Sequence, residues 1–126
     1  MKSKLSRKYQ ARNRLMRNQL SSLILFESVT TTVAKAKQLK TEAQAFISKL
    51  NTSENEVNIK RYINSLLYGG AQMKAYDIRK EVSCVKTYKL DERFGDGAQR
   101  MMVKLVVNES KKTPEKKENK PVKSKK

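Results

Sequence analysis

The stretch SVTTTVAKAKQLKTEAQAFISKL at residues 28–50 decides the fold, because its pattern changes from that of a strand to that of a helix within a few positions. SVTTTV, at residues 28–33, is rich in β-branched residues and predicts a short strand. Thr32 can then act as the N-cap of the following helix, with its hydroxyl accepting a hydrogen bond from an unpaired backbone N–H of the first turn. That helix is predicted to be amphipathic. Its apolar stripe consists of Ala36, Leu39, Ala43, Phe46, Ile47 and Leu50.

The segment before this junction predicts another helix, which begins between residues 9 and 13 and runs to about residue 27. Its apolar residues recur at helical spacing from Met16 to Ile24 and form one face. We expect the other side to project into solvent. It carries Arg14, Arg17, Asn18 and Ser21.

The segment after the junction predicts two further helices and a pair of strands. A third helix follows from the helical spacing between Ile59 and Leu67, and Gly69-Gly70 should end it because glycine accepts a positive φ. A weaker fourth helix should cover residues 71–82. Residues 84–89 and 101–107 then alternate with period two around the turn sequence GDG, which predicts an antiparallel pair joined by a long loop.

These elements predict an α+β fold in one small domain, with about four helices, a short strand after the first helix and a C-terminal antiparallel strand pair. The chain of 126 residues has 29 Lys and Arg against 12 Asp and Glu, which gives a net charge of +17. We expect a basic N-terminal arm at residues 1–12, the α+β domain at residues 13–108, and a Lys-rich tail at residues 109–126. The tail is too poor in apolar residues to offset the entropy of ordering, and is predicted to be disordered.

Most catalytic and metal-binding chemistry is disfavoured by composition. The chain has no His, which removes His general bases, Ser/His/Asp triads and His metal ligands. Cys84 is the single cysteine and is expected to act as a small buried hydrophobe. No apolar run approaches the roughly 20 residues of a membrane span. We expect a soluble intracellular protein that is not an enzyme and has no cofactor, metal or small-molecule substrate.

The aromatic residues give little support for a surface that stacks on single-stranded nucleic acid. Phe26, Phe46 and Tyr62 fall at core-compatible positions of helices. Stacking sheets need exposed aromatics clustered on strands, and Tyr88 and Phe94 are the candidates. The sequence therefore argues against such a stacking module.

The N-terminal segment KSKLSRKYQARNRLMRN, at residues 2–18, indicates nucleic-acid binding. It has seven basic residues and no acid, and it leads directly into an amphipathic helix. Basic arms of this kind pair with phosphates as counterions leave, and Arg adds bidentate contacts. Composition does not separate RNA from DNA. A second candidate phosphate site lies at the start of the second helix, where the helix N-terminus favours an anion. It comprises Thr31, Thr32, Lys35 and Lys37.

Several motifs resemble the L-seventeen family of bacterial large-subunit ribosomal proteins. They are KLSR at residues 4–7, ARNRLMRNQLSSLI at residues 11–24, VTTTVAKAKQLK at residues 29–40 and, more weakly, GDGAQRMMVKLV at residues 95–106. The corresponding family patterns are KLGR, HRxALLRNL, TTLAKAKELR and GDNAPMAIIELV. This chain departs from the family at Ala11, where the family has His. It also has VSCVKT at residues 82–87 in place of a GGYTRI-like strand, so that Lys86 falls where Arg is expected.

The resemblance implies a non-catalytic structural protein of the large ribosomal subunit. Such a protein binds large-subunit ribosomal RNA, has neighbouring ribosomal proteins as partners, and lies near the exit of the nascent-peptide tunnel in cytoplasmic ribosomes. Its fold has the short strand joined to the two later strands. The alternative is a free nucleic-acid-binding protein of the nucleoid or of ribosome assembly. The expected RNA-binding residues are Lys2, Lys4, Arg7, Lys8, Arg12, Arg14, Arg17, Asn18, Thr31, Thr32, Lys35, Lys37, Lys40 and Lys86.

Overall fold

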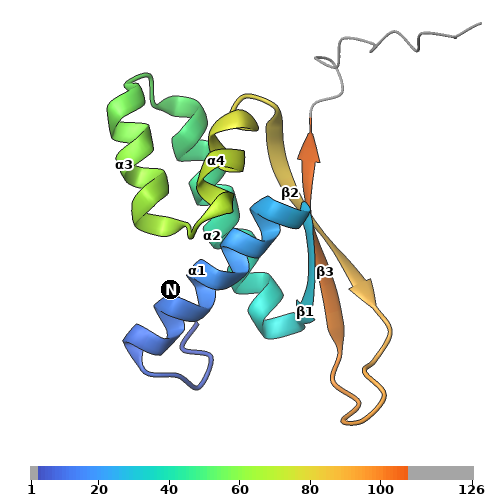
Figure 1. Ribbon diagram of the computed structural model, residues 1–126. Helices are drawn as coiled ribbons and strands as arrows, with labels where there is room; N and C mark the ends of the chain where they lie inside the picture. The colour runs from blue at the N-terminus through green and yellow to red at the C-terminus, as the bar shows by residue number, and fades with distance from the viewer. Residues whose placement is uncertain (1–2, 108–126) are drawn as a thin grey trace, which may run out of the picture.

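Four helices and three strands make up residues 3–107, which are the part of the chain that the computed structural model describes (Figure 1). The predictions for Lys2 and for the tail at residues 109–126 lie outside these residues. The strand-to-helix junction is where the sequence predicts it, and the α+β fold class is confirmed. In chain order the elements are α1 (Tyr9–Phe26), β1 (Ser28–Thr32), α2 (Val33–Thr52), α3 (Glu56–Leu66), α4 (Gly70–Asp77), β2 (Val82–Leu90) and β3 (Arg100–Val107).

The three strands form one antiparallel sheet in the order β1-β3-β2. β3 therefore pairs with the short strand on one side and with its hairpin partner on the other, as the resemblance implies. The register runs from Ser28 opposite Lys104 to Thr32 opposite Arg100. The helices lie on one side of this sheet, and the far end of the β2–β3 hairpin extends beyond them (Figure 1).

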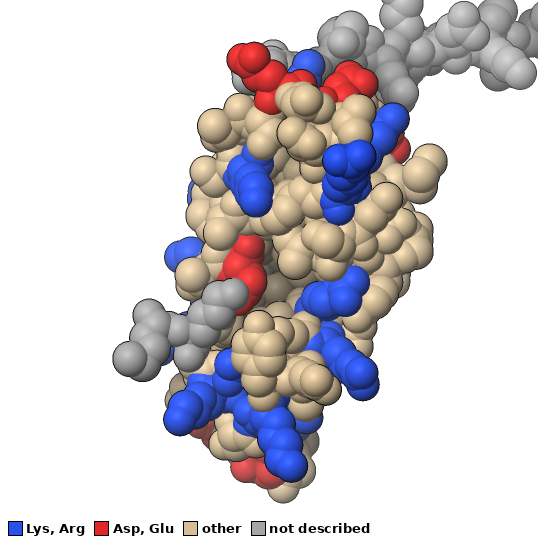
Figure 2. All heavy atoms as spheres, turned by 90° about the vertical axis from the view of Figure 1, so that its left-hand side faces the viewer, with Lys and Arg blue, Asp and Glu red and all other residues tan. Residues whose placement is uncertain are grey.

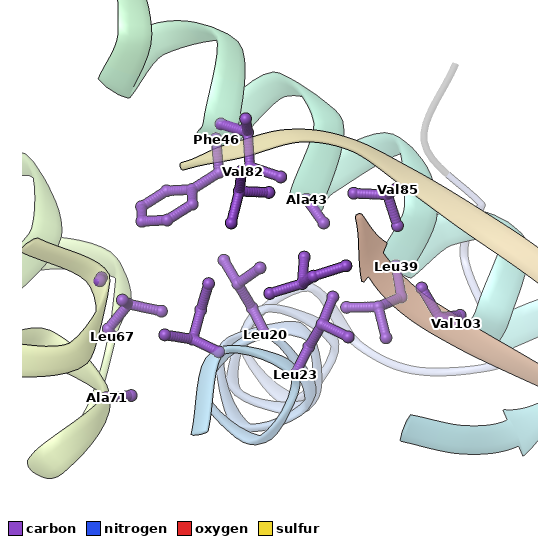
Figure 3. Packing of buried hydrophobic residues seen from close by; sticks show 14 of the residues in the cluster. Leu20, Leu23, Leu39, Ala43, Phe46, Leu67, Ala71, Val82, Val85 and Val103 are labelled. Carbon is purple, nitrogen blue, oxygen red and sulfur yellow. The ribbon is translucent and has the colours of Figure 1, made fainter. Parts of the chain in front are cut away.

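The core fills the space between α1, α2, α4 and one face of the sheet. All six residues of the predicted α2 stripe are buried. In Figure 3, Leu39 of α2 lies between Leu23 of α1 and Val103 of β3, and Ala43 of α2 lies beside Val85 of β2. Burying one such side chain contributes about 1.5–3 kcal/mol, so this cluster supplies most of the cohesion of the fold.

The glycine pair and the fourth helix differ from the predictions. α3 ends at Leu66, and Gly69, with φ of 49°, is the N-cap of α4 rather than the stop of α3. α4 ends at Asp77 because Val82 is drawn into the sheet, where it pairs with Val107. Helical spacing continues across residues 78–82, but strand pairing overrides it.

Three side chains of α1 and of the junction between β1 and α2 also differ from expectation. Ser21 is buried, and its hydroxyl accepts a hydrogen bond from the Tyr68 N–H at 3.0 Å. Phe26 is 72% exposed, because it lies two residues, and hence about 200° around the helix, beyond buried Ile24. Thr32 is the N-cap residue of α2, but its side chain makes no capping bond. The backbone supplies an acceptor there instead, since the N–H of the next residue, the first of α2, donates to the Gln99 carbonyl at 3.3 Å.

Candidate nucleic-acid interface

The basic arm folds back in a tight turn before α1. The Arg7 N–H donates to the Lys4 carbonyl at 3.1 Å, and the two residues between them, Leu5 and Ser6, both have φ of 51°. Positive φ at both central positions is the geometry of a type I′ turn. The side chains of Lys4, Arg7 and Lys8 are exposed. The turn therefore presents its cations to solvent.

A hydrogen bond attaches the described part of the arm to α2. The Ser3 N–H donates to the Gln38 side-chain oxygen at 3.1 Å. Beside this bond lies a shallow hollow of about 530 Å³, whose lining includes Ser3, Val33, Lys37 and Thr41. Two segments that the sequence treats as separate candidates, the arm and the start of α2, are thereby brought together.

The cations of α1 point to two different sides of the helix. Arg12 lines a groove of about 460 Å³ beside the end of α3, together with Tyr9, Asn13 and apolar Met16. Its guanidinium carbon lies 5.6 Å from the centroid of the Tyr9 ring. Helical geometry puts Arg14 and Asn18 on the other side of α1, and both are exposed.

Arg17 has a structural role that its sequence does not reveal. Its guanidinium carbon lies 4.3 Å from the centroid of the Tyr68 ring, and its Nε donates to the Leu66 carbonyl at 3.4 Å. The side chain is half-buried instead of projecting freely. The expectation of a solvent-facing Arg17 is wrong, because the segment between α3 and α4 folds over this part of α1.

The residues predicted around the start of α2 do not form one cluster. Lys37 and Lys40 are exposed, and Lys37 lies next to the arm. Lys35 is half-buried and lies about 200° around the helix from Lys37. Thr31 is engaged within the protein, because its hydroxyl oxygen accepts from the Gln19 side chain at 3.2 Å.

Lys86 lies apart from the other candidates, in the middle of β2. It is directly opposite Lys104 of β3. Lys104, and Arg100 at the start of β3, are not among the residues predicted to bind RNA. Alternation along the strand indicates that these two residues share a face of β3, but it does not indicate which residues of β2 lie opposite them across the hairpin.

Figure 2 shows the face that carries α3 and the first half of α1. Lys and Arg are spread over it and gather at its lower end, where the arm and the start of α1 lie, with few acidic side chains among them. Within residues 3–107, no group of His, Cys, Asp and Glu could hold a metal ion. Among the described helices, none combines the length and apolarity that crossing a membrane requires. The cations gathered at the lower end of this face make that end suited to binding anions.

Comparison with known proteins gives two concordant results. The family model described as "Ribosomal protein L17" matches residues 15–106. The "Large ribosomal subunit protein bL17" of Endomicrobium trichonymphae is 31% identical over 111 residues, which cover 82% of this chain and 93% of the relative. The protein of the same name from Borrelia hermsii is 30% identical over 109 residues, covering 82% and 89%. That from Pelagibacter ubique is 30% identical over 108 residues, covering 82% and 74%.

Proposed function

Because this chain belongs to the ribosomal protein L17 family, and is therefore a structural protein of the large ribosomal subunit, we propose that it binds large-subunit ribosomal RNA through one continuous basic surface. This arm surface consists of residues 3–18 and the exposed side of the first two turns of α2. The observation that carries the proposal is the hydrogen bond from the Ser3 N–H to Gln38, because it holds the arm beside Lys37.

The charge of the arm surface favours a polyanion. The first acidic residue of the chain is Glu27, so the arm and α1 contribute only cations. Lys4, Arg7 and Lys8 are exposed in the turn, and Arg14 is exposed on α1. Each phosphate that such a side chain neutralises releases condensed counterions, which is the main source of affinity for nucleic acid.

The groove beside Arg12 offers a more specific contact. Arg12 lies against the Tyr9 ring, and its guanidinium can make paired hydrogen bonds to a phosphate while the ring limits its movement. Asn13 adds a side chain that can bind ribose or base. Glu42 also lines the groove and accepts a hydrogen bond from the Gln38 side chain at 3.1 Å. Within this groove we therefore expect a phosphate to bind at Arg12.

The family resemblance supports a proposal for the location and the partners. We propose that the protein lies near the exit of the nascent-peptide tunnel, in contact with neighbouring ribosomal proteins as well as RNA. Its role is structural rather than catalytic. The arm surface would face the RNA.

Co-sedimentation with isolated large subunits tests this proposal. The wild-type chain should stay with the subunits through a high-salt wash. The double variant Arg7→Glu with Lys37→Glu reverses two charges on the arm surface and should be released. The control Lys60→Glu with Lys80→Glu makes the same change in net charge at exposed positions of α3 and the segment after α4, and should stay bound.

The same experiment distinguishes the proposed function from the alternative function. A free protein of the nucleoid or of ribosome assembly would leave the subunits at high salt and would bind duplex DNA as well as ribosomal RNA. Equal release of both double variants would show that net charge alone drives the association. Either result would contradict the proposed function.

A further inference from the structure

The sheet has one face that no described helix covers. The helices pack on the opposite face, which carries the buried residues Val85, Val103 and Leu105. Side chains alternate between the faces of a strand, so the pairing register defines the rows of the open face. From the hairpin end these rows are Leu90–Arg100–Thr32, Tyr88–Met102–Thr30, Lys86–Lys104–Ser28 and Cys84–Val106.

The third row puts two like charges directly opposite each other. Lys86 and Lys104 are cross-strand partners, and both side chains are exposed. Like charges in this arrangement destabilise a sheet. Within residues 3–107, neither ammonium forms an ion pair, and none of the residues on the open face is acidic. The free protein therefore bears a repulsion that an external anion would relieve.

The second row puts an aromatic ring between cationic rows. Tyr88 is 45% exposed and has Met102 beside it. Arg100 lies in the row before it, and its Nε donates to the Asp91 carbonyl at 3.0 Å, which fixes the guanidinium near the hairpin. Successive rows on one face are two residues, or about 7 Å, apart. Cations thus flank the tyrosine on both sides along the strand direction.

We propose that this open face is a second RNA contact, which takes a single-stranded segment with one unstacked base on Tyr88 and the neighbouring phosphates at Lys86, Lys104 and Arg100. Stacking on an aromatic ring tolerates any base, while the cations hold the backbone on either side. This inference rests on the proposed function, since it assumes RNA as the partner. It also revises the expectation that the protein has no stacking surface, because a single exposed tyrosine can stack on a single base.

Charge complementarity favours RNA over a protein on this face. A protein partner would have to bring acidic side chains to three cations and bury the lysine pair with them. RNA supplies the phosphates along its whole backbone, and an unpaired base supplies the flat apolar group for Tyr88 and Met102.

Binding of the full-length protein to two probes tests the inference: a transcript of the complete large-subunit ribosomal RNA, and oligouridine as a plain single strand. Tyr88→Ala should weaken binding to both by roughly 5- to 100-fold with an unchanged salt slope, and Tyr88→Phe should restore it. Lys86→Gln with Lys104→Gln should lower the slope of log K against log salt by about 1.4, since each single-strand contact contributes about 0.7.

The control is Lys89→Gln, which lies on the same strand but on the other face and should change neither affinity nor slope. Thermal unfolding of each variant confirms that the fold is retained. If the wild-type chain binds no ribosomal RNA, the proposed function itself fails. If it binds and only arm-surface variants weaken it, the second contact is overturned alone. Sheet variants that bind RNA normally but enter subunits poorly would identify a protein on this face and overturn the inference.

Discussion

Arg17 stacks on Tyr68 with its guanidinium carbon 4.3 Å from the ring centroid, and this pair joins the middle of α1 to the segment between α3 and α4. The same guanidinium donates to the Leu66 carbonyl. A cation in a chain that carries a charge of +17 is therefore used to hold the protein together.

Arg17→Ala should destabilise the free protein. It removes a partly buried cation–π contact and a hydrogen bond to a carbonyl, which together are worth about 1–2 kcal/mol. Arg14→Ala, on the exposed side of α1, should change stability by less than about 0.5 kcal/mol. Urea unfolding of both variants without RNA measures the two changes in stability, and equal changes would contradict a structural role for Arg17.

Ser21→Ala should cost more than its size suggests. The buried hydroxyl accepts from the Tyr68 N–H, and its removal leaves that donor without its partner, at a cost of about 1–3 kcal/mol. Ser48→Ala, at an exposed position of α2, is the matched control and should be close to neutral. Chemical denaturation measures both, and a neutral Ser21→Ala would mean that water replaces the hydroxyl.

Ser6→Gly should tighten the turn of the arm. Ser6 has φ of 51°, a conformation that costs an L-residue roughly 1–2 kcal/mol, whereas glycine adopts it freely but loses more entropy on ordering. The net gain should slow exchange of the Arg7 amide, which donates across the turn, by about two- to fivefold. Amide hydrogen exchange tests this. Faster exchange in the variant would show that the turn is not strained.

Deleting residues 1–8 should reduce the salt dependence of RNA binding. The deletion removes four basic side chains, so the slope of log K against log salt should fall by roughly three. Deleting residues 113–126 removes six Lys and two Glu, the same net charge, but no part of the arm surface. Its effect on the slope should be less than about one. If the two deletions lowered the slope equally in a salt series on one RNA, the arm would contribute only its net charge.

The hairpin loop contains a pH-sensitive contact. The hydrogen bond from the Arg93 guanidinium holds the pKa of Asp96 well below its ordinary value, and the Ala98 N–H acts in the same direction. A depressed pKa in the fold means that this contact is fully present above the ordinary pKa of Asp, near 4, and is lost as pH falls through the lowered value. An NMR titration should find the Asp96 carboxylate still ionised at pH 3. In Arg93→Gln its pKa should return toward 4, and an unshifted wild-type value would refute the contact.

Periodicity along the chain predicted most of the elements, because helices and strands bury their apolar faces at fixed spacing. The apolar stripe of α2 and the alternate apolar residues of β3 are both buried in the core for this reason. Where tertiary packing competes with local pattern, the prediction failed. Val82 has helical spacing relative to Ile78, but pairing with Val107 places it in a strand.

The candidate site was predictable in composition but not in arrangement. A run of cationic residues indicates an anion-binding segment, and the cationic side chains in the turn of the arm are exposed. Which cations face each other depends on the register across a loop of nine residues, so the pairing of Lys86 with Lys104 could not be read from the pattern. The bond from the Ser3 N–H to Gln38 spans 35 positions and likewise has no local signature.

The central strand of the sheet is also the last one to be synthesised. β1 ends at Thr32, but its partner in the sheet, β3, begins only at Arg100, so β1 stays unpaired until β3 has been made. Closing a loop of this length costs entropy before any strand contact repays it. During synthesis the helices can collapse on one another early, whereas the sheet completes in a late, slow step. A chain stopped before residue 100 would therefore expose the apolar sides of α1 and α2 that the sheet normally covers, and would be prone to aggregation.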